Sequence, residues 1–215
     1  MKVGVLELYA KKVDDIHNCQ ICPLHKTCLR PVPGRGDLRS KIVLVGEAPG
    51  ADEDLYNKPF VGRAGKHLDR MLKAAGLKRE ELYVTNIVKC RPPDNREPKL
   101  AEVTWCINHL LNEIIILDPR VVVTMGNYPT QSYIGLRANR VPRISVAREK
   151  YYIFQSDYLD KHQLVYPVYH PSYSMRQGWD SKETTDTIHD FIKLREFMED
   201  MWLPTLSRNE IWLQR

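Results

Sequence analysis

Four short runs of branched apolar residues occur along the chain, and each has glycine, asparagine, proline or histidine in or near its end. The runs lie at residues 41–46, 81–88, 120–126 and 163–169. Apolar runs of this length, bounded by turn residues, are typical of strands buried on both faces of a parallel sheet. Because segments with helical periodicity lie between and after them, the pattern predicts an α/β fold. Those segments are 68–75, 100–117, 128–136 and 184–201.

The first 40 residues differ from this alternation. Residues 3–16 place apolar and charged side chains on opposite faces of an amphipathic helix. Residues 19–40 then carry repeated prolines and glycines, which predict a long loop that needs an external tether. We therefore expect a single domain over 1–215, with an N-terminal arm at about 1–40 and a C-terminal helix at about 181–201.

The composition of the chain indicates its cellular compartment and the partners that it can have. The chain has 215 residues and a formal net charge of +5, which is compatible with nucleic acid but also occurs in ordinary proteins. No apolar run approaches the roughly 20 residues of a membrane span, so we expect a cytoplasmic protein with no membrane partner.

In such a reducing compartment, cysteines more often bind metals or take part in catalysis than form disulfides. Of the five cysteines, Cys19 and Cys22 form a C-x2-C pair whose thiolates can reach one metal. Cys90 and Cys106 are distant in sequence and can join that pair only through folding. Four ligands from two segments would fasten the N-terminal arm to the core.

The loop after the first strand is the first candidate site. Glu47 stands where a parallel strand ends, and ligands bind at this edge of an open α/β sheet. Phe60, between Pro59 and a Val-Gly pair, is well placed to stack on a base, although a core Phe is the alternative. Asn86, near the end of the second run, either reads the edge of a ligand or is satisfied by the backbone.

Five motifs occur in a fixed order along the chain. They are Gly46-Glu47-Ala48-Pro49-Gly50, Pro59-Phe60-Val61-Gly62-Arg63-Ala64-Gly65, Val84-Thr85-Asn86, Lys89-Cys90-Arg91-Pro92-Pro93 and His170-Pro171-Ser172. Together they resemble family 4 (type-4) uracil-DNA glycosylases over about residues 19–176. The resemblance implies a three-layer α/β/α sandwich around a four-stranded parallel sheet, and a [4Fe-4S] cluster held by four cysteines.

The resemblance also assigns roles to individual residues. It places the iron–sulfur cluster on Cys19, Cys22, Cys90 and Cys106. It places the uracil pocket at Gly46, Glu47, Ala48, Phe60, Asn86 and His170. Cys28 is left as a free thiol, and His17 and His25 rank low as ligands of an alternative zinc ion.

This pocket would act on a base that has been flipped out of DNA. Asn86 would donate to uracil O4 and accept from N3–H, a pattern that cytosine reverses. His170 would stabilise the negative charge that develops on O2 as the glycosidic bond breaks. The residue that orients water stays open between Glu47 and Glu53, because Ala48 stands where the best-known uracil family has an aspartate.

The residues after His170 are expected to contact DNA. We expect 171–177 to form a loop that enters the minor groove, with Met175 as an apolar wedge and Arg176 on a flanking phosphate. A plain turn that opens a helix is the alternative. Five basic residues around a hairpin-like stretch either form a solvated face or meet phosphates. They are Arg137, Arg140, Arg143, Arg148 and Lys150.

The resemblance thus predicts a DNA repair enzyme that hydrolyses the N-glycosidic bond of uracil in single- or double-stranded DNA and leaves an abasic site. Two alternatives keep the scaffold: a non-catalytic DNA-binding protein, and a sister glycosylase that traps DNA covalently through a histidine on an inserted loop. The first conflicts with the retained pocket residues, and the second with the short, histidine-free stretch 91–96. We expect a monomer, and the sequence leaves a sliding clamp open as a partner.

Overall fold

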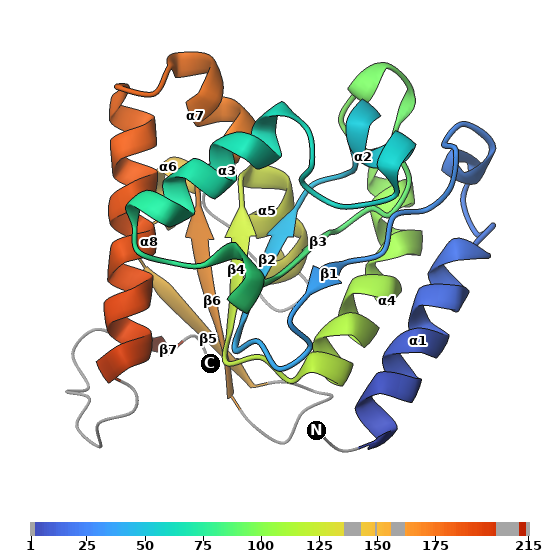
Figure 1. Cartoon of the computed structure of the whole chain (residues 1–215), viewed down its shortest axis with the longest axis horizontal. Coiled ribbons are helices and arrows are strands. Elements are labelled where there is room, and N and C mark those ends of the chain that lie inside the picture. Colours follow the sequence, from blue (N-terminus) through green and yellow to red (C-terminus); the bar gives the residue numbers. More distant parts are fainter. Residues whose placement is uncertain (1–2, 136–142, 149, 156–161, 201–210, 214–215) are drawn as a thin grey trace.

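A seven-stranded sheet forms the centre of the part of the chain that the structure describes (Figure 1). The structure is a computed structural model, and it describes residues 3–135, 143–148, 150–155, 162–200 and 211–213. The strands are β1 (Arg35–Gly36), β2 (Ile42–Gly46), β3 (Tyr83–Asn86), β4 (Val121–Met125), β5 (Tyr151–Gln155), β6 (His162–Val168) and β7 (Ile211–Leu213). Their order across the sheet is β1-β3-β2-β4-β6-β5-β7.

The four middle strands, β3-β2-β4-β6, are parallel, and they correspond to the four apolar runs of the sequence. The predicted α/β fold is confirmed, but the sheet is larger than the four strands expected. β1 pairs antiparallel with β3, β5 pairs antiparallel with β6, and β7 pairs with β5. The sequence pattern did not predict these edge strands. β1 has only two residues, and β5 follows the basic stretch directly.

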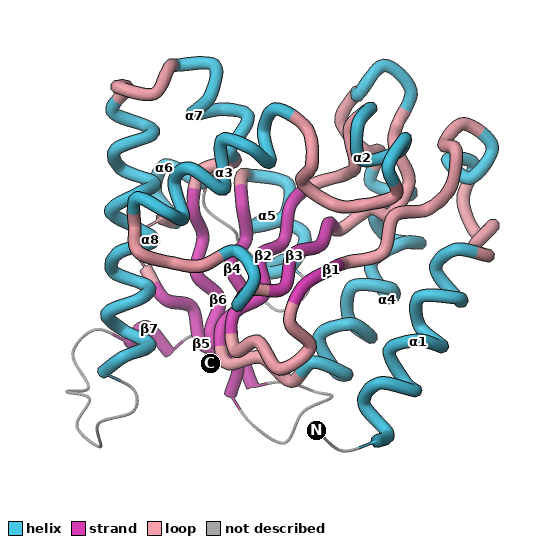
Figure 2. The backbone as a smooth tube through the Cα atoms, viewed as in Figure 1, coloured by secondary structure: helices cyan, strands magenta, loops and turns pink. Residues whose placement is uncertain are grey.

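Three helices cover one face of the sheet (Figure 2). They are α3 (Arg63–Ala74), α7 (Pro171–Gln177) and α8 (Lys182–Asp200). The three helices contact one another. Leu72 of α3 and Phe191 of α8 belong to the same buried apolar cluster as Val84 of β3.

The opposite face is covered by α1 (Val3–His17), α4 (Leu100–Leu117) and α5 (Asn127–Gly135), and α6 (Ile144–Ala147) adds one short turn of helix. Leu110 of α4 and Tyr133 of α5 share a second apolar cluster with Val45 of β2. Because successive side chains of a strand point to opposite faces, Leu44 and Val45 belong to different clusters. The predicted three-layer α/β/α sandwich is therefore confirmed.

Helix α4 is long and apolar enough, by length and composition, to cross a membrane. Half of its apolar window is buried, and the helix packs against α1. Its buried residues include Glu102, His109 and Glu113. Packing in the core therefore accounts for its apolar composition.

The N-terminal arm is hydrogen-bonded to the short helix α2 (Ala51–Tyr56) and the residues after it. The backbone N–H of Leu29 donates to Oδ1 of Asp54 over 2.9 Å. The Asn57 side chain donates to the Pro31 carbonyl over 2.9 Å and lies 2.9 Å from Nε2 of His17. The arm also contains the 3-10 turn η1 (Pro23–Lys26), while η2 (Arg79–Glu81) and η3 (Pro93–Asn95) precede β3 and α4.

The loop expected at 171–177 is helix α7, so that prediction was wrong and the helix-opening alternative holds. Pro171 occupies the first turn, where a missing N–H costs nothing, and His170 caps the helix with its side chain. The C-terminal helix expected at about 181–201 is α8, and residue 201 lies outside the described residues.

The basic stretch before β5 contains α6 where a hairpin-like turn was expected. Arg148 forms salt bridges of 3.1 Å with both Asp186 and Asp190 of α8. Its guanidinium therefore ties α6 to α8, which makes it unavailable as a phosphate contact. Arg137 and Arg140 lie outside the described residues.

Candidate active site

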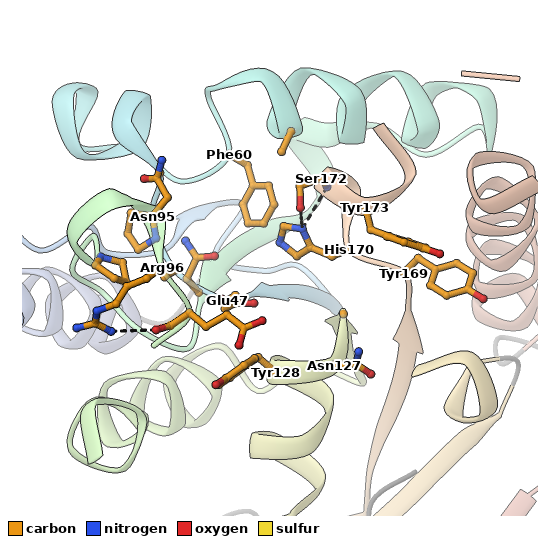
Figure 3. A pocket seen from close by; sticks show the side chains of 18 of the residues that line it. Glu47, Phe60, Asn95, Arg96, Asn127, Tyr128, Tyr169, His170, Ser172 and Tyr173 are labelled. Carbon is orange, nitrogen blue, oxygen red and sulfur yellow. Dashed lines mark hydrogen bonds between the residues drawn. The ribbon is translucent and has the colours of Figure 1, made fainter. Parts of the chain in front are cut away.

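A cavity of about 580 Å³ opens at the carboxyl ends of the four parallel strands (Figure 3). Loops after β2, β3, β4 and β6 all contribute to it, which is the usual place for a ligand in an open α/β sheet. The predicted residues that line it are Glu47, Ala48, Glu53, Phe60, Asn86, His170 and Arg176. The structure thus brings together side chains from four distant segments.

Gly46 lies directly behind this cavity and lets two side chains approach the backbone. A Cβ atom at this position would lie 2.4 Å from Oδ1 of Asn86 and 2.4 Å from Cζ of Phe60. β2 and β3 are in register here, with Gly46 beside Asn86. Any larger residue would therefore displace the phenyl ring or the carboxamide.

Phe60 forms one wall of the cavity in an unusual backbone conformation. Its φ is 55°, in the left-handed region that residues with a side chain rarely adopt. Gly65 makes this turn possible, since a Cβ there would lie 2.0 Å from the Phe60 carbonyl oxygen. The ring centroid lies 6.2 Å from that of His170, with 41° between the planes. Strain of this kind is concentrated at functional sites.

Glu53 holds the loop that carries Phe60. Its carboxylate accepts backbone N–H groups from Gly50 at 3.0 Å, Val61 at 3.0 Å and Gly62 at 2.8 Å. Oε1 is therefore occupied by the two residues that follow Phe60, and Oε2 by the residue that precedes α2. The sequence left Glu47 and Glu53 as alternatives for orienting water. In the structure, the Glu53 carboxylate positions the loop that carries Phe60.

Glu47 lines the cavity together with Phe60 and His170 (Figure 3). Burial and, second, the nearby carboxylate of Glu97 raise the pKa of Glu47 to about 7. The hydroxyl of Tyr128 hydrogen-bonds that same Glu97 carboxylate. A carboxyl group that changes its charge near neutral pH is suited to acid–base or electrostatic work in a reaction.

His170 is held in one tautomer by the helix that it caps. The backbone N–H of Ser172 donates to Nδ1 of His170 over 3.1 Å, and the Ser172 hydroxyl lies 2.7 Å from the same atom. Burial and, second, Arg176 lower the pKa of His170 to about 4, so the ring is neutral at pH 7. Because Nδ1 accepts an N–H, the proton of the neutral ring is on Nε2. Gly126 gives the ring room, since a Cβ there would lie 2.9 Å from the His170 Cβ.

Asn86 lines the cavity and carries a buried, unpaired polar atom. The side chain is only 2% exposed, and its Oδ1 has no hydrogen-bond partner among the described residues. A buried carbonyl oxygen without a donor costs about 1–3 kcal/mol. The alternative in which the backbone satisfies this oxygen therefore does not hold among the described residues.

The two residues expected to contact DNA lie on α7 but differ in position. Arg176 is exposed and lines the rim of the cavity. Met175 is half-buried and does not belong to the lining.

Several lining residues were not singled out from the sequence. They include Asn95, Arg96, Glu97, Asn127, Tyr128, Ser145, Tyr169 and Tyr173. Asp94 and Asn95 have left-handed φ values of 55° and 53°, and the sequence Pro-Pro-Asp-Asn is a turn signal from which this bend could have been predicted. Glu97 and Tyr128 carry no such signal, because only the fold places them beside Glu47.

The four cysteines assigned to a cluster also meet in the structure. Cys19, Cys22, Cys90 and Cys106 line one small, mostly apolar cavity, and each has a free thiol. Burial raises the pKa of Cys22, and raises that of Cys106 to about 11. A bound cation reverses such shifts and is coordinated by the thiolates. Among the described residues, no group of three or more His, Cys, Asp and Glu side chains is arranged to hold a single metal ion.

The remaining thiol and the alternative ligands lie beside this cavity or away from it. Cys28 hydrogen-bonds Cys90 but is not part of the lining. His25 does line the cavity, and its Nδ1 lies 2.6 Å from the Cys22 carbonyl oxygen. His17 is not among the residues that line the cavity, and its Nε2 is hydrogen-bonded to Oδ1 of Asn57.

Comparison with known proteins agrees with this architecture. The Uracil DNA glycosylase superfamily matches residues 33–193. A type-4 uracil-DNA glycosylase of Archaeoglobus fulgidus is 42% identical over 160 residues, which cover 74% of this chain and 79% of the relative. Another, from Sulfurisphaera tokodaii, is 37% identical over 184 residues, or 85% and 81% of the two chains.

A type-5 uracil-DNA glycosylase of Thermus thermophilus is 36% identical, but the match covers only 53% of this chain and 59% of the relative. The chain belongs to the uracil-DNA glycosylase superfamily and, within it, to the type-4 group.

Proposed function

We propose that the protein removes uracil from DNA. In this reaction the flipped nucleotide enters the cavity, the N-glycosidic bond is hydrolysed, and free uracil and an abasic site are formed. The type-4 relatives are named for this activity. The cavity supplies a wall for the ring, a carboxamide for its edge and a histidine for the departing anion.

The observation that carries the proposal is the unpaired Oδ1 of Asn86. Uracil N3–H supplies the donor that this oxygen lacks, and the carboxamide N–H donates to uracil O4. Cytosine has an acceptor at N3 and a donor at C4, so both contacts would be lost. Each unsatisfied buried group costs about 1–3 kcal/mol, which is enough to exclude cytosine.

His170 and Glu47 act on the bond that breaks. As C1′ loses uracil, negative charge collects on O2, and the Nε2–H of neutral His170 is the donor for it. The sugar becomes positively charged, and the Glu47 carboxylate offsets that charge or orients the attacking water. The water oxygen bonds to C1′, its proton is released, and the uracil anion takes up a proton after departure.

The DNA strand would lie along the rim formed by α7, because exposed Arg176 borders the cavity there. A guanidinium at this position can hold the phosphate next to the flipped nucleotide. Met175, on the same helix, stays a prediction as the residue that fills the vacated stack.

We further propose that the four cysteines hold a [4Fe-4S] cluster. Four thiols around one cavity are a donor set that iron–sulfur clusters use. When bound, the cluster would fasten the N-terminal arm to the residues after β3 and to α4. The described residues that line the catalytic cavity include no cysteine, so we expect these thiols to hold the structure and to take no part in cleavage.

The proposal is tested with oligonucleotides that contain one uracil, one cytosine or one thymine at the same position. Release of free uracil and an alkali-labile site from the uracil strand alone is the expected result. An Asn86→Ala variant is the matched control, and it should bind metal as wild type does but lose most cleavage. A wild-type protein that binds uracil DNA without cleaving it would contradict the proposal. The expected cytoplasmic location, monomeric state and sliding-clamp partner remain predictions.

A further inference from the structure

Lys89 is a buried lysine whose ammonium group has three protein partners. The side chain is 1% exposed, and Nζ donates to Oε2 of Glu113 over 2.6 Å. It also donates to Oγ1 of Thr85 over 2.6 Å and to the main-chain oxygen of Asn86 over 2.8 Å. A lysine ammonium has three N–H donors, so all of them are used.

Glu113 on α4 completes the network from the other side. Its side chain is fully buried, and Oε2 accepts from the Thr85 hydroxyl at 2.8 Å as well as from Lys89. Oε1 accepts from the backbone N–H of Gly34 at 2.8 Å and from the Tyr83 hydroxyl at 3.0 Å. The buried pair therefore joins β3, α4 and the N-terminal arm.

The backbone of Lys89 continues this connection. Its N–H donates to Sγ of Cys106 over 3.2 Å, and its carbonyl accepts from the N–H of Val32 over 2.6 Å. Cys90 is the next residue. Lys89 thus links the strand end that carries Asn86 to Cys106 of α4 and to Val32 of the N-terminal arm.

We infer that Lys89, held by Glu113, is a positioning residue for Asn86. β3 ends at Asn86, and the next four residues form bends in which the backbone N–H groups of Ile87 and Val88 still donate to the Gly46 and Glu47 carbonyls. At this end the Lys89 ammonium fixes the peptide carbonyl of Asn86, and with it the direction of the carboxamide that faces the cavity. The inference rests on the proposed function, because it concerns how the base is read.

The burial of two full charges supports a task beyond stability. An apolar pair of similar volume often stabilises a protein core as well as a buried ion pair does, or better. A contribution to stability therefore does not explain why this position holds an ion pair. The ion pair fixes the direction of the groups that it contacts, because each of its hydrogen bonds has a defined donor and acceptor. A base-reading group must be held to within about 0.5 Å of its productive position.

The test is a double-mutant cycle. The pair variant Lys89→Met with Glu113→Gln removes both charges together and leaves neither one buried without a partner. It is combined with Asn86→Ala, and single-turnover cleavage of a uracil oligonucleotide is measured for all four proteins. If Lys89 acts through Asn86, the pair variant should slow cleavage about tenfold to 100-fold when Asn86 is present. When Asn86 is absent, the same change should alter the rate by less than about twofold.

Three further measurements separate positioning from other effects. Leu110→Ala is a control on α4 that lowers stability without removing a hydrogen bond of the network, and it should change the rate equally in both backgrounds. Iron and sulfide content is determined for every variant, so that a lost cluster is not mistaken for a misplaced carboxamide. Where the pair variant does not fold, Thr85→Val takes its place in the cycle, because it removes one partner of Lys89 and keeps both charges.

An equal loss in both backgrounds, or a loss that follows the iron content alone, would overturn the role of Lys89. Unchanged cleavage by a pair variant that has lost the network would overturn it as well. A wild-type protein without uracil cleavage would instead overturn the proposed function, and this inference with it.

Discussion

The backbone N–H of Ser172 donates to Nδ1 of His170 over 3.1 Å, and this contact decides which ring nitrogen carries the proton. The proton is on Nε2, and the pKa of about 4 keeps the ring neutral at physiological pH. A neutral imidazole can donate to a developing anion without first having to be charged. The helix cap and the proposed catalytic group are thus the same side chain.

We expect His170→Ala to lower the single-turnover rate of uracil cleavage by about 100-fold or more. Affinity for uracil DNA should change far less, because the His170 bond strengthens mainly as charge develops on O2. Ser172→Ala is the matched control, and its loss should be smaller because the backbone N–H that fixes the tautomer remains. Weaker DNA binding with an unchanged chemical step would show that this role is wrong.

Asn86→Asp should change which base is read. An ionised carboxylate puts an acceptor where the carboxamide donates to uracil O4, so uracil cleavage should fall steeply. A protonated carboxyl group can donate to N3 of cytosine, so some cytosine cleavage is expected at low pH. Cleavage of matched uracil and cytosine oligonucleotides over a pH series measures both effects. Full uracil cleavage by this variant would remove the base-reading role from Asn86.

Uracil cleavage should rise with pH through about 7, because Glu47 acts in its ionised form and its pKa is about 7. Glu97→Gln removes the nearby charge that contributes to this raised pKa, so the midpoint should move to lower pH. Glu47→Gln should slow cleavage and abolish the rise. Single-turnover rates across neutral pH provide the measurement, and a rise that persists in Glu47→Gln would assign it to another group.

Stability should show the opposite trend. The pKa of Glu47 is raised from 4.5 to about 7 in the folded protein, so between these values the folded state holds a proton that the unfolded chain has lost. The contribution of Glu47 to the free energy of unfolding therefore falls as pH rises through this window. Glu47→Gln should flatten this part of the profile, and urea unfolding at several pH values measures it. An unaltered slope would count against the raised pKa.

Protein purified without oxygen should contain iron and sulfide and be brown. Cys90→Ala should lose the cluster and unfold more easily, because the arm loses its tether. Cys28→Ser should keep the iron, since Cys28 lies outside the cavity that the other four cysteines line. Metal analysis and thermal unfolding of both variants provide the measurements. One zinc without iron or sulfide in wild type would contradict the proposed cluster.

Local pattern was sufficient for the centre of the fold. β2 and β4 are runs of aliphatic residues that have no exposed face, so their burial is visible in composition alone. β1 and β5 depend instead on neighbours distant in sequence, because an edge strand is defined by its partner. Helix α7 was misread because His170-Pro171 resembles a loop, although the same two residues cap and begin the helix.

A residue of the candidate site was predictable from the sequence where its polar side chain contrasts with an apolar strand. Asn86 is a polar residue in a buried strand, and His170 follows another, so both were visible as exceptions to their surroundings. Glu53 was harder to interpret, because two of its three backbone partners, Val61 and Gly62, come from a turn whose shape is set by Phe60 and Gly65. Glu97 and Tyr128 were missed because their approach to Glu47 exists only in the folded chain.

Strand β1 has two residues, yet it covers the outer edge of β3. Gly36 fits closely against that strand, and a Cβ there would lie 2.0 Å from the Leu82 carbonyl oxygen. Without β1, β3 would offer unpaired backbone groups to another molecule, and exposed edges of this kind promote aggregation. Release of the arm would therefore lead to self-association of the protein, in addition to the loss of its pocket geometry.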